Sequence, residues 1–294
     1  MLKATTPEIK DNPRFKCIIF GPPGAGKSKF AYSFKNAYIH GTENTTEYRH
    51  FAEQIKGNNS VYIEVDTLDD VIDEVHDLLS TKHKYTTYIF DSPSPLYHTM
   101  LGLEAERLAK KDGSEGDEYQ RNAKKANRKL ARLSLLLSRL DMNVIIITHE
   151  KNKFENGRDA GMTYDLPVRL GHAVGTILHL NMLGSQRKAK VVKTRYDAEM
   201  PINDFIDFTI DGHEEICKRL GIEIFQKLST PDPLATSAQV EELLALLQYH
   251  NVPEEKVQDW LLKGKAASLE ELAAKHAQSL IEYLKSKPQP TEGK

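Results

Sequence analysis

The sequence predicts an α/β domain with a mainly parallel sheet, followed by a small helical domain. Up to residue 228, short apolar runs alternate with amphipathic segments, which is typical of parallel strands joined by crossover helices. After residue 228 the pattern is helical only. Apolar residues make up 39% of the 294 residues and charged residues 28%, so the chain can form a large core and is not disordered as a whole.

The expected strands are short apolar runs bounded by polar residues. In chain order they cover 15–21, 37–41, 60–65, 85–90, 143–148, 174–180 and 188–193. Amphipathic segments at 68–79 and 123–140 are expected to be helices between them. We therefore expect most of the sheet to be parallel, with helices on its faces.

The C-terminal part is expected to form a separate small unit. The stretch STPDPLAT, which begins at Ser229, holds two prolines and is typical of a linker. Thr236 with Gln239 and Ser268 with Glu271 each fit a capping box at a helix start. The expected division is a core at 1–228, a flexible linker at 229–235, a helical module at 236–286 and a disordered tail at 287–294.

Charge and cysteine content exclude several classes of protein. Forty basic residues face 42 acidic ones, so net charge neither requires nor forbids a polyanionic partner. Cys17 and Cys217 are too few and too far apart for a disulfide scaffold or a cysteine-based zinc site. No apolar run approaches the ~20 residues that span a bilayer, and the first 16 residues lack the apolar part of a secretion signal. We expect no membrane association and a cytoplasmic location.

The strongest motif matches G-x-x-x-x-G-K-[ST], the phosphate-binding P-loop. Its residues are Gly21, Pro22, Pro23, Gly24, Ala25, Gly26, Lys27 and Ser28, with Lys29 directly after them. Small residues let backbone N–H groups curl around phosphates, while Lys27 reaches the β- and γ-phosphates and Ser28 coordinates Mg²⁺. The alternative is a chance glycine-rich turn. An apolar strand before the motif and a helix-compatible segment after it favour nucleotide binding.

Polar residues at the ends of three other expected strands complete a candidate site. Asp91 ends a buried strand, where P-loop proteins place a carboxylate that holds Mg²⁺ through water. Glu43 follows another strand and is suited to orient or deprotonate the attacking water. Thr148 and His149 end a third strand, where a polar side chain can sense the γ-phosphate. The alternatives are a strand-terminating Asp91, a solvated Glu43 and an ordinary capping or satisfied histidine.

This order of elements resembles the core of the RecA/Rad51 recombinases. The similarity covers roughly residues 14–228, and the GPPGAGKS loop looks closest to the phage-encoded RecA-like ATPases that accompany or replace single-strand annealing proteins. It implies a RecA-like P-loop fold and two DNA-binding loops, at 101–119 and 150–165. It also implies that Lys193 and Arg195 reach across a subunit interface to ATP on the neighbouring subunit. The usual glutamine of that family is His149 here.

Basic and aromatic residues suggest where single-stranded DNA binds. Arg121, Lys125, Arg128 and Arg132 lie on one face of the helix expected at 121–140. Lys151, Lys153, Phe154 and Arg158 lie in a loop with Gly and Asn, which we expect to be mobile. The alternatives are a solvated amphipathic helix packed on the sheet and a disordered surface loop.

These patterns predict an ATP-binding, Mg²⁺-dependent ATPase stimulated by single-stranded DNA, acting in recombination or annealing. We expect a homo-oligomer with ATP at subunit interfaces, in the host cytoplasm if a phage encodes it. The C-terminal helices are expected to bind DNA or a single-strand binding or annealing protein. The alternatives are a P-loop phosphotransferase on a small metabolite and a P-loop loader or interaction module for replication proteins.

Overall fold

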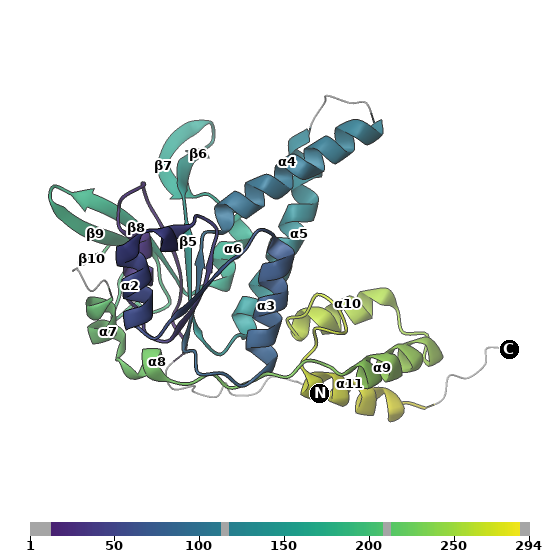
Figure 1. Ribbon diagram of the computed structural model, residues 1–294. Coiled ribbons are helices and arrows are strands. Elements are labelled where there is room, and N and C mark those ends of the chain that lie inside the picture. The colour runs from purple at the N-terminus through teal and green to yellow at the C-terminus, as the bar shows by residue number, and fades with distance from the viewer. Residues whose placement is uncertain (1–12, 113–117, 208–212, 289–294) are drawn as a thin grey trace.

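The computed structural model describes residues 13–112, 118–207 and 213–288, and an eight-stranded sheet forms its centre (Figure 1). The strand order is β10-β9-β8-β1-β5-β4-β2-β3. The strands from β8 to β3 in this order are parallel, whereas β9 and β10 are antiparallel to their neighbours. The strands are β1 (Lys16–Phe20), β2 (Ala37–Gly41), β3 (Val61–Glu64), β4 (Thr87–Asp91), β5 (Asn143–Thr148), β8 (Thr176–Leu183), β9 (Gln186–Lys193) and β10 (Phe205–Asp207).

Helices cover both faces of the sheet, which explains why its central strands are almost entirely apolar. The helices of the first domain are α1 (Lys27–Ala31), α2 (Arg49–Gly57), α3 (Leu68–Ser80), α4 (Pro93–Asp112), α5 (Glu118–Arg139), α6 (Val168–Ala173), α7 (Glu214–Leu220) and α8 (Glu223–Gln226), with a 3₁₀ turn η1 (Thr45–Glu47). Ile18 and Phe20 of β1 pack with α3 to α6, whereas Cys17 and Ile19 pack with α1, α2, α7 and α8. No helix within the described ranges is long and apolar enough to cross a bilayer.

The architecture predicted from the sequence is confirmed: an α/β domain with a mainly parallel sheet, followed by C-terminal helices. Each of the seven expected strands is present within a few residues. The helix after the P-loop is shorter than its helix-compatible sequence suggests: α1 ends at Ala31 after five residues.

The segment 150–165 is not the mobile loop that the sequence predicts. It forms an antiparallel hairpin of β6 (Glu150–Glu155) and β7 (Arg158–Tyr164), which stands beyond the carboxyl edge of the sheet (Figure 1). Asn156 and Gly157 turn the chain with φ of 52° and 75°. Positive φ at both turn residues is the requirement of a type I′ hairpin turn, and Asn-Gly is its strongest sequence signal.

The C-terminal helices are α9 (Ser237–Tyr249), α10 (Glu254–Lys263) and α11 (Ala274–Lys285). They enclose an apolar cluster of their own, which includes Leu243, Leu261, Leu272 and Ile281. The capping box predicted at Thr236 and Gln239 is confirmed at the start of α9. The limits of the core, linker, module and tail remain predictions, and residues 289–294 of the expected tail lie outside the described chain.

The segment 229–235 and the C-terminal helices are bonded to the first domain near α3 and α5 (Figure 1). The backbone N–H of Asp232 donates to Leu79 O at 2.8 Å, and its carboxylate pairs with Arg139 at 2.8 Å. The prediction of a capping box at Ser268 and Glu271 is wrong, since α11 begins only at Ala274. Glu271 instead pairs with Arg132 of α5.

Glu271 is 1% exposed, and its ion pair with Arg132 joins the C-terminal helices to the first domain. Burial alone raises the pKa of Glu271, but hydrogen bonds from His76, the backbone N–H of Ala267 and Arg132 outweigh it and bring the pKa to about 2. His76 Nε2 lies 3.3 Å from the Glu271 carboxylate, so α3 and α5 both hold this residue. The C-terminal helices are thus anchored through a buried charge.

We expect Glu271→Gln to lower the free energy of unfolding at pH 7 by about 3 kcal/mol. This is the free energy that corresponds to lowering the pKa of the carboxyl group from 4.5 to about 2 on folding. The folded-state pKa lies below the unfolded one, so the contribution is complete above about pH 4.5 and is lost as the pH falls toward 2. Urea unfolding at pH 7 and pH 3 measures both, with the exposed neighbour Glu270→Gln as control. Equal losses at both pH values would contradict the ionic role.

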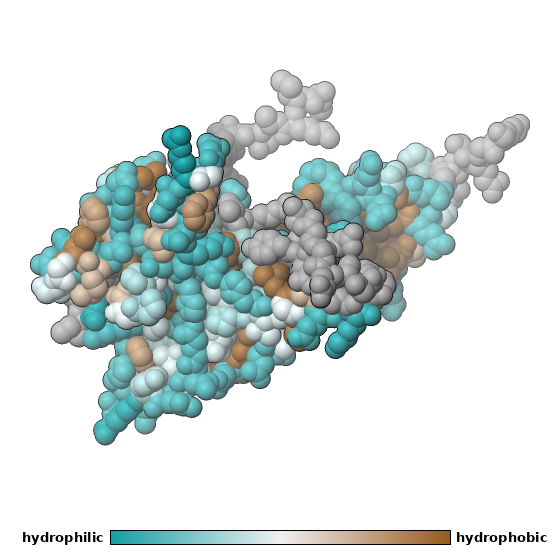
Figure 2. Space-filling view, turned by 90° about the horizontal axis from the view of Figure 1, so that it is seen from above, coloured by the Kyte–Doolittle hydropathy of each residue, from teal (hydrophilic) through white to brown (hydrophobic). Residues whose placement is uncertain are grey.

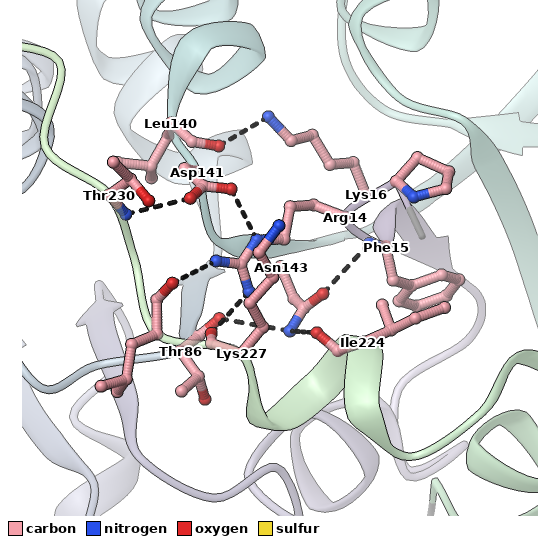
Figure 3. Close-up of polar contacts among 12 residues, drawn as sticks. Arg14, Phe15, Lys16, Thr86, Leu140, Asp141, Asn143, Ile224, Lys227 and Thr230 are labelled. Carbon is pink, nitrogen blue, oxygen red and sulfur yellow. Dashed lines mark hydrogen bonds and ion pairs between the residues drawn. The ribbon is translucent and has the colours of Figure 1, made fainter. Parts of the chain in front are cut away.

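The amino edge of the sheet is tied together by buried polar side chains (Figure 3). The Asn143 amide oxygen accepts from Phe15 N at 3.0 Å, and its nitrogen donates to Ile224 O at 3.3 Å. Arg14 pairs with Asp141 at 2.7 Å and also donates to the backbone carbonyls of residues 227 and 228. These bonds fix β1 and β5 against the chain that leads to the C-terminal helices.

Candidate nucleotide-binding site

The P-loop connects β1 to α1 at the carboxyl edge of the sheet. Gly24 and Gly26 have φ of 76° and 96°, a region that side chains other than glycine rarely adopt. A Cβ on Gly21 would lie 2.3 Å from Leu180 O of the neighbouring strand, so only glycine fits beside β8. The glycines of the motif therefore meet requirements of this backbone.

Lys27 lies inside the curl of this loop. Its ammonium donates to Gly21 O at 2.8 Å and to Pro22 O at 2.9 Å. Burial lowers the pKa of Lys27, and the nearby carboxylates of Asp91, Glu43 and Glu150 oppose this shift. The structure thus brings the predicted lysine into the field of the acids at the ends of β2, β4 and β5.

Asp91 ends β4 next to the P-loop and is 3% exposed. Burial raises its pKa, while hydrogen bonds from Ser28 and Tyr32 and the charge of Lys27 oppose the rise. The Tyr32 hydroxyl donates to Asp91 Oδ2 at 2.8 Å, so α1 orients the carboxylate. No sequence pattern singles out Tyr32, because its partner lies 59 residues away.

The oxygens of Ser28 and Asp91 suit Mg²⁺, which prefers hard oxygen ligands and keeps several waters. The described residues contain no group of three or more His, Cys, Asp or Glu side chains able to hold a metal. Magnesium sites at nucleotides use one or two protein oxygens together with phosphate oxygens. The residues present therefore fit Mg²⁺ bound with a nucleotide.

Glu43 and His149 meet across the same edge, as their positions after parallel strands predict. His149 Nε2 lies 2.9 Å from Glu43 Oε1, and both side chains are about half exposed. Thr148, in contrast, is buried: its hydroxyl donates to His149 O at 2.7 Å and accepts from Asp165 N at 3.2 Å. Thr148 therefore supports the backbone that carries His149.

Other residues at this edge did not follow from the sequence. Glu150 starts β6 and pairs with His179 at 3.1 Å, and His179 stacks on Phe20 with ring centroids 4.3 Å apart. The side chain of Arg187, in β9, lies against Gly26. These contacts depend on β8 lying next to β1, which no local pattern indicates.

Lys193 and Arg195 lie at the opposite, amino edge, because Lys193 pairs with Ile177 at the start of β8. The Lys193 ammonium donates to Gly171 O at 2.6 Å and to Val174 O at 2.8 Å. Arg195 is exposed and lines a cleft of about 1230 Å³. Neither residue is near the P-loop of its own chain, so a role at ATP requires a neighbouring subunit.

The basic face of α5 is partly neutralised within the chain. Lys125 lies 3.5 Å from Glu104, and Arg132 pairs with Glu271. Arg128 is exposed, and the described residues provide it with no ion pair. The side chain of Arg121 lies outside the described part of the structure. These pairs favour the alternative of an amphipathic helix packed on the sheet over a continuous DNA-binding stripe.

The β6–β7 hairpin presents the other candidate DNA contacts. Phe154 is 65% exposed and Arg158 is exposed, whereas Lys151 and Lys153 pair with Asp165 and Glu155. Of the other expected DNA-binding loop, 101–119, residues 101–112 belong to α4, and 113–117 lie outside the described residues. Seen from above, the surface is mostly hydrophilic with scattered hydrophobic groups (Figure 2).

Comparison with known proteins identifies the first domain. Residues 14–195 match the protein family described as an AAA domain. No curated protein sequence matches the chain. Sixty-seven chains of solved structures do, among them the crystal structure of the RadB recombinase, with 16% identity and a TM-score of 0.40 over 67% of this chain and 89% of that chain. A likeness at this level carries no information on substrate.

Proposed function

We propose, from the premise that this chain belongs to the AAA domain family, that it is a RecA-like ATPase that acts on single-stranded DNA. The reaction is Mg²⁺-dependent hydrolysis of ATP, and its setting is homologous recombination or annealing of the kind that phages encode, in the host cytoplasm. The family membership and the P-loop support nucleotide binding and hydrolysis. The resemblance to phage RecA-like ATPases supports the DNA substrate and the setting.

The observation that carries the proposal is the convergence of Lys27, Ser28, Asp91 and Glu43 at one edge of the sheet. Ser28 is hydrogen-bonded to Asp91, and Lys27 lies in the field of Asp91 and Glu43. These residues come from three different strand ends, so their meeting is a property of the fold and not of one motif. A chance glycine-rich turn would not place these partners around it.

Each residue has a role that its position supports. Lys27 leaves the two loop carbonyls to neutralise phosphate oxygens, since a charged acceptor is stronger than a carbonyl. Ser28 and Asp91 would hold Mg²⁺ at this site, and the ion would supply positive charge that offsets the charge of the nucleotide phosphates. Glu43 orients the attacking water, and His149 holds Glu43 in place at 2.9 Å.

The oligomer in this proposal places Arg195 at the nucleotide of a neighbouring subunit. Its exposed side chain lies at the amino edge, opposite the P-loop, so a head-to-tail arrangement would bring it to the neighbour's carboxyl edge. Lys193 has a smaller part, because its ammonium is bonded to two carbonyls that shape the turn before β8. Lys265, beyond α10, lines the same cleft as Arg195, which supports a role of the C-terminal helices in assembly.

The DNA-binding part of the proposal rests on the β6–β7 hairpin and, with less support, on Arg128. Phe154 offers an exposed ring for base stacking, and Arg158 of the same hairpin is exposed. Lys151 and Lys153 can exchange their carboxylate partners for phosphates of DNA. The hairpin begins directly after His149, which contacts Glu43. A shift of the hairpin when it binds DNA would therefore move His149, and through it Glu43, which positions the water. The C-terminal helices are proposed to bind a single-strand binding or annealing protein.

The decisive test is ATP hydrolysis by the purified protein with and without single-stranded DNA. We expect Mg²⁺-dependent hydrolysis that single-stranded DNA stimulates, and we expect Phe154→Ala to lose the stimulation but keep the basal rate. Phe51→Ala is unsuitable as a control because that ring packs in the core, whereas Tyr249→Ala removes a comparably exposed ring in α9. If the wild-type protein hydrolyses ATP at the same rate with and without single-stranded DNA, the DNA substrate is refuted and the ATPase assignment stands.

A further inference from the structure

Arg187 projects toward the P-loop from a hairpin that the predicted site did not include. β8 runs parallel to β1, with His179 opposite Phe20, so the residues after Leu180 extend past the start of the P-loop. β9 returns alongside this extension, and Arg187 pairs with Met182 in it. The hairpin thus carries Arg187 beyond the carboxyl edge of the sheet, on the side of the nucleotide site.

The side chain of Arg187 lies directly against Gly26. A Cβ placed on Gly26 would meet Arg187 Cδ at 3.2 Å, Nε at 3.4 Å and Cζ at 3.9 Å. The guanidinium group therefore rests over the residue that precedes Lys27. Gly26 also has a φ of 96°, so both its backbone and its missing side chain make room for this approach.

The guanidinium is available for a ligand. Arg187 is exposed, and within the described ranges no hydrogen bond or ion pair holds its side chain. Its neighbour Lys188, in contrast, lies 3.3 Å from Asp207. The carboxylates of Asp91, Glu43 and Glu150 surround Lys27, so the site itself contributes more negative than positive charge before an anion enters. A polyphosphate at this site needs a further cation.

We propose that Arg187 is a phosphate-binding residue that acts on the nucleotide in the P-loop of its own chain. Arginine suits this position because its planar fork can donate two parallel hydrogen bonds to phosphate oxygens. The inference rests on the proposed function, in which the P-loop binds ATP. It differs from the role of Arg195, which lies at the opposite edge and serves a neighbouring subunit.

The experiment measures ATP and ADP affinity by calorimetry for the wild-type protein, Arg187→Gln and Arg187→Lys, in the presence of Mg²⁺. We expect Arg187→Gln to raise the Kd for ATP about tenfold to a hundredfold, the range for a lost hydrogen bond to a charged group. Arg187→Lys keeps the charge without the fork and should give an intermediate loss. Lys190→Gln is the matched control, since Lys190 lies on the same strand and points to the opposite face.

The measurement is repeated at protein concentrations below and above the one at which the protein self-associates. A loss that is the same at every concentration supports action within one chain, whereas a loss confined to the assembled protein would overturn the proposal. Equal ATP affinity of the wild-type protein and Arg187→Gln would also overturn it. Absence of ATP binding in the wild-type protein would refute the proposed function as well, which separates the two failures. Circular dichroism confirms that each variant is folded.

Discussion

Lys27→Ala should reduce ATP hydrolysis by at least about 100-fold while the protein stays folded, because it removes the main cation of the phosphate site. Within the described residues the hydrogen bonds of the ammonium go to two carbonyls of its own loop, and burial lowers the pKa of Lys27. Removal of the ammonium therefore costs little folding free energy, and its effect on hydrolysis can be measured separately from its effect on stability. The rate of phosphate release at saturating ATP, with thermal unfolding of the same preparation, provides both values.

Lys35→Ala is the control for this variant. Lys35 is exposed in the chain that follows α1, away from the P-loop, so the same loss of charge should leave hydrolysis unchanged. Hydrolysis at the wild-type rate by folded Lys27→Ala protein would remove the basis of the nucleotide site. A variant that hydrolyses slowly but unfolds several degrees earlier would show that the two loop carbonyls need the lysine for stability.

The sequence predicted the part of the site that follows from strand ends. Gly21 to Ser28 form one contiguous motif, and parallel strands bring Asp91, Glu43 and His149 to one edge whatever the length of the intervening helices. Their placement at one edge thus needed no knowledge of tertiary packing beyond a parallel sheet, whereas the contact between Glu43 and His149 also depends on the strand order. Their separation of 106 residues shows how far this rule reaches.

Contacts between neighbouring elements could not be read in the same way. Arg187 reaches Gly26 only because β8 pairs with β1 and the hairpin continues past the sheet. Glu271 follows Ser268 at the spacing of a capping box, yet the buried ion pair with Arg132 decides its position. The same four-residue spacing fits a capping box and a glutamate that pairs with a distant residue. The tertiary partner determines which of the two forms.

The hairpin at 150–165 was predictable, and its signal was in the sequence. Asn156-Gly157 is the dipeptide of a type I′ turn, and the flanking residues pair from Glu150 with Tyr164 to Glu155 with Arg158. Charge and glycine content suggested a mobile loop instead. Because both strands are exposed, they lack the alternating apolar pattern that identifies strands covering a core.

Mixing experiments should separate the cation supplied by a neighbour from the cation supplied by the same chain. Arg195→Ala alone and Lys27→Ala alone should each be inactive. A mixture should recover activity, because an Arg195→Ala subunit has an intact P-loop and a Lys27→Ala neighbour supplies Arg195. In random head-to-tail assemblies of equal amounts, one interface in four joins these halves, so recovery should peak at about a quarter of the wild-type rate.

Arg187→Ala mixed with Lys27→Ala is the internal control, assayed at an ATP concentration well below the raised Kd of the Arg187→Ala protein. At no ratio should its rate exceed the sum of the rates of the two separate variants. Arg187 lies against Gly26 of its own chain, so each subunit of this mixture carries a P-loop that lacks either Lys27 or Arg187. The exchange of subunits is verified with fluorescent labels in both mixtures. Failure of the Arg195 mixture to recover would assign Arg195 a structural role, since its exposed side chain lies far from the P-loop edge of its own chain. Recovery in the Arg187 mixture would instead show that the β8–β9 hairpin reaches a neighbouring nucleotide.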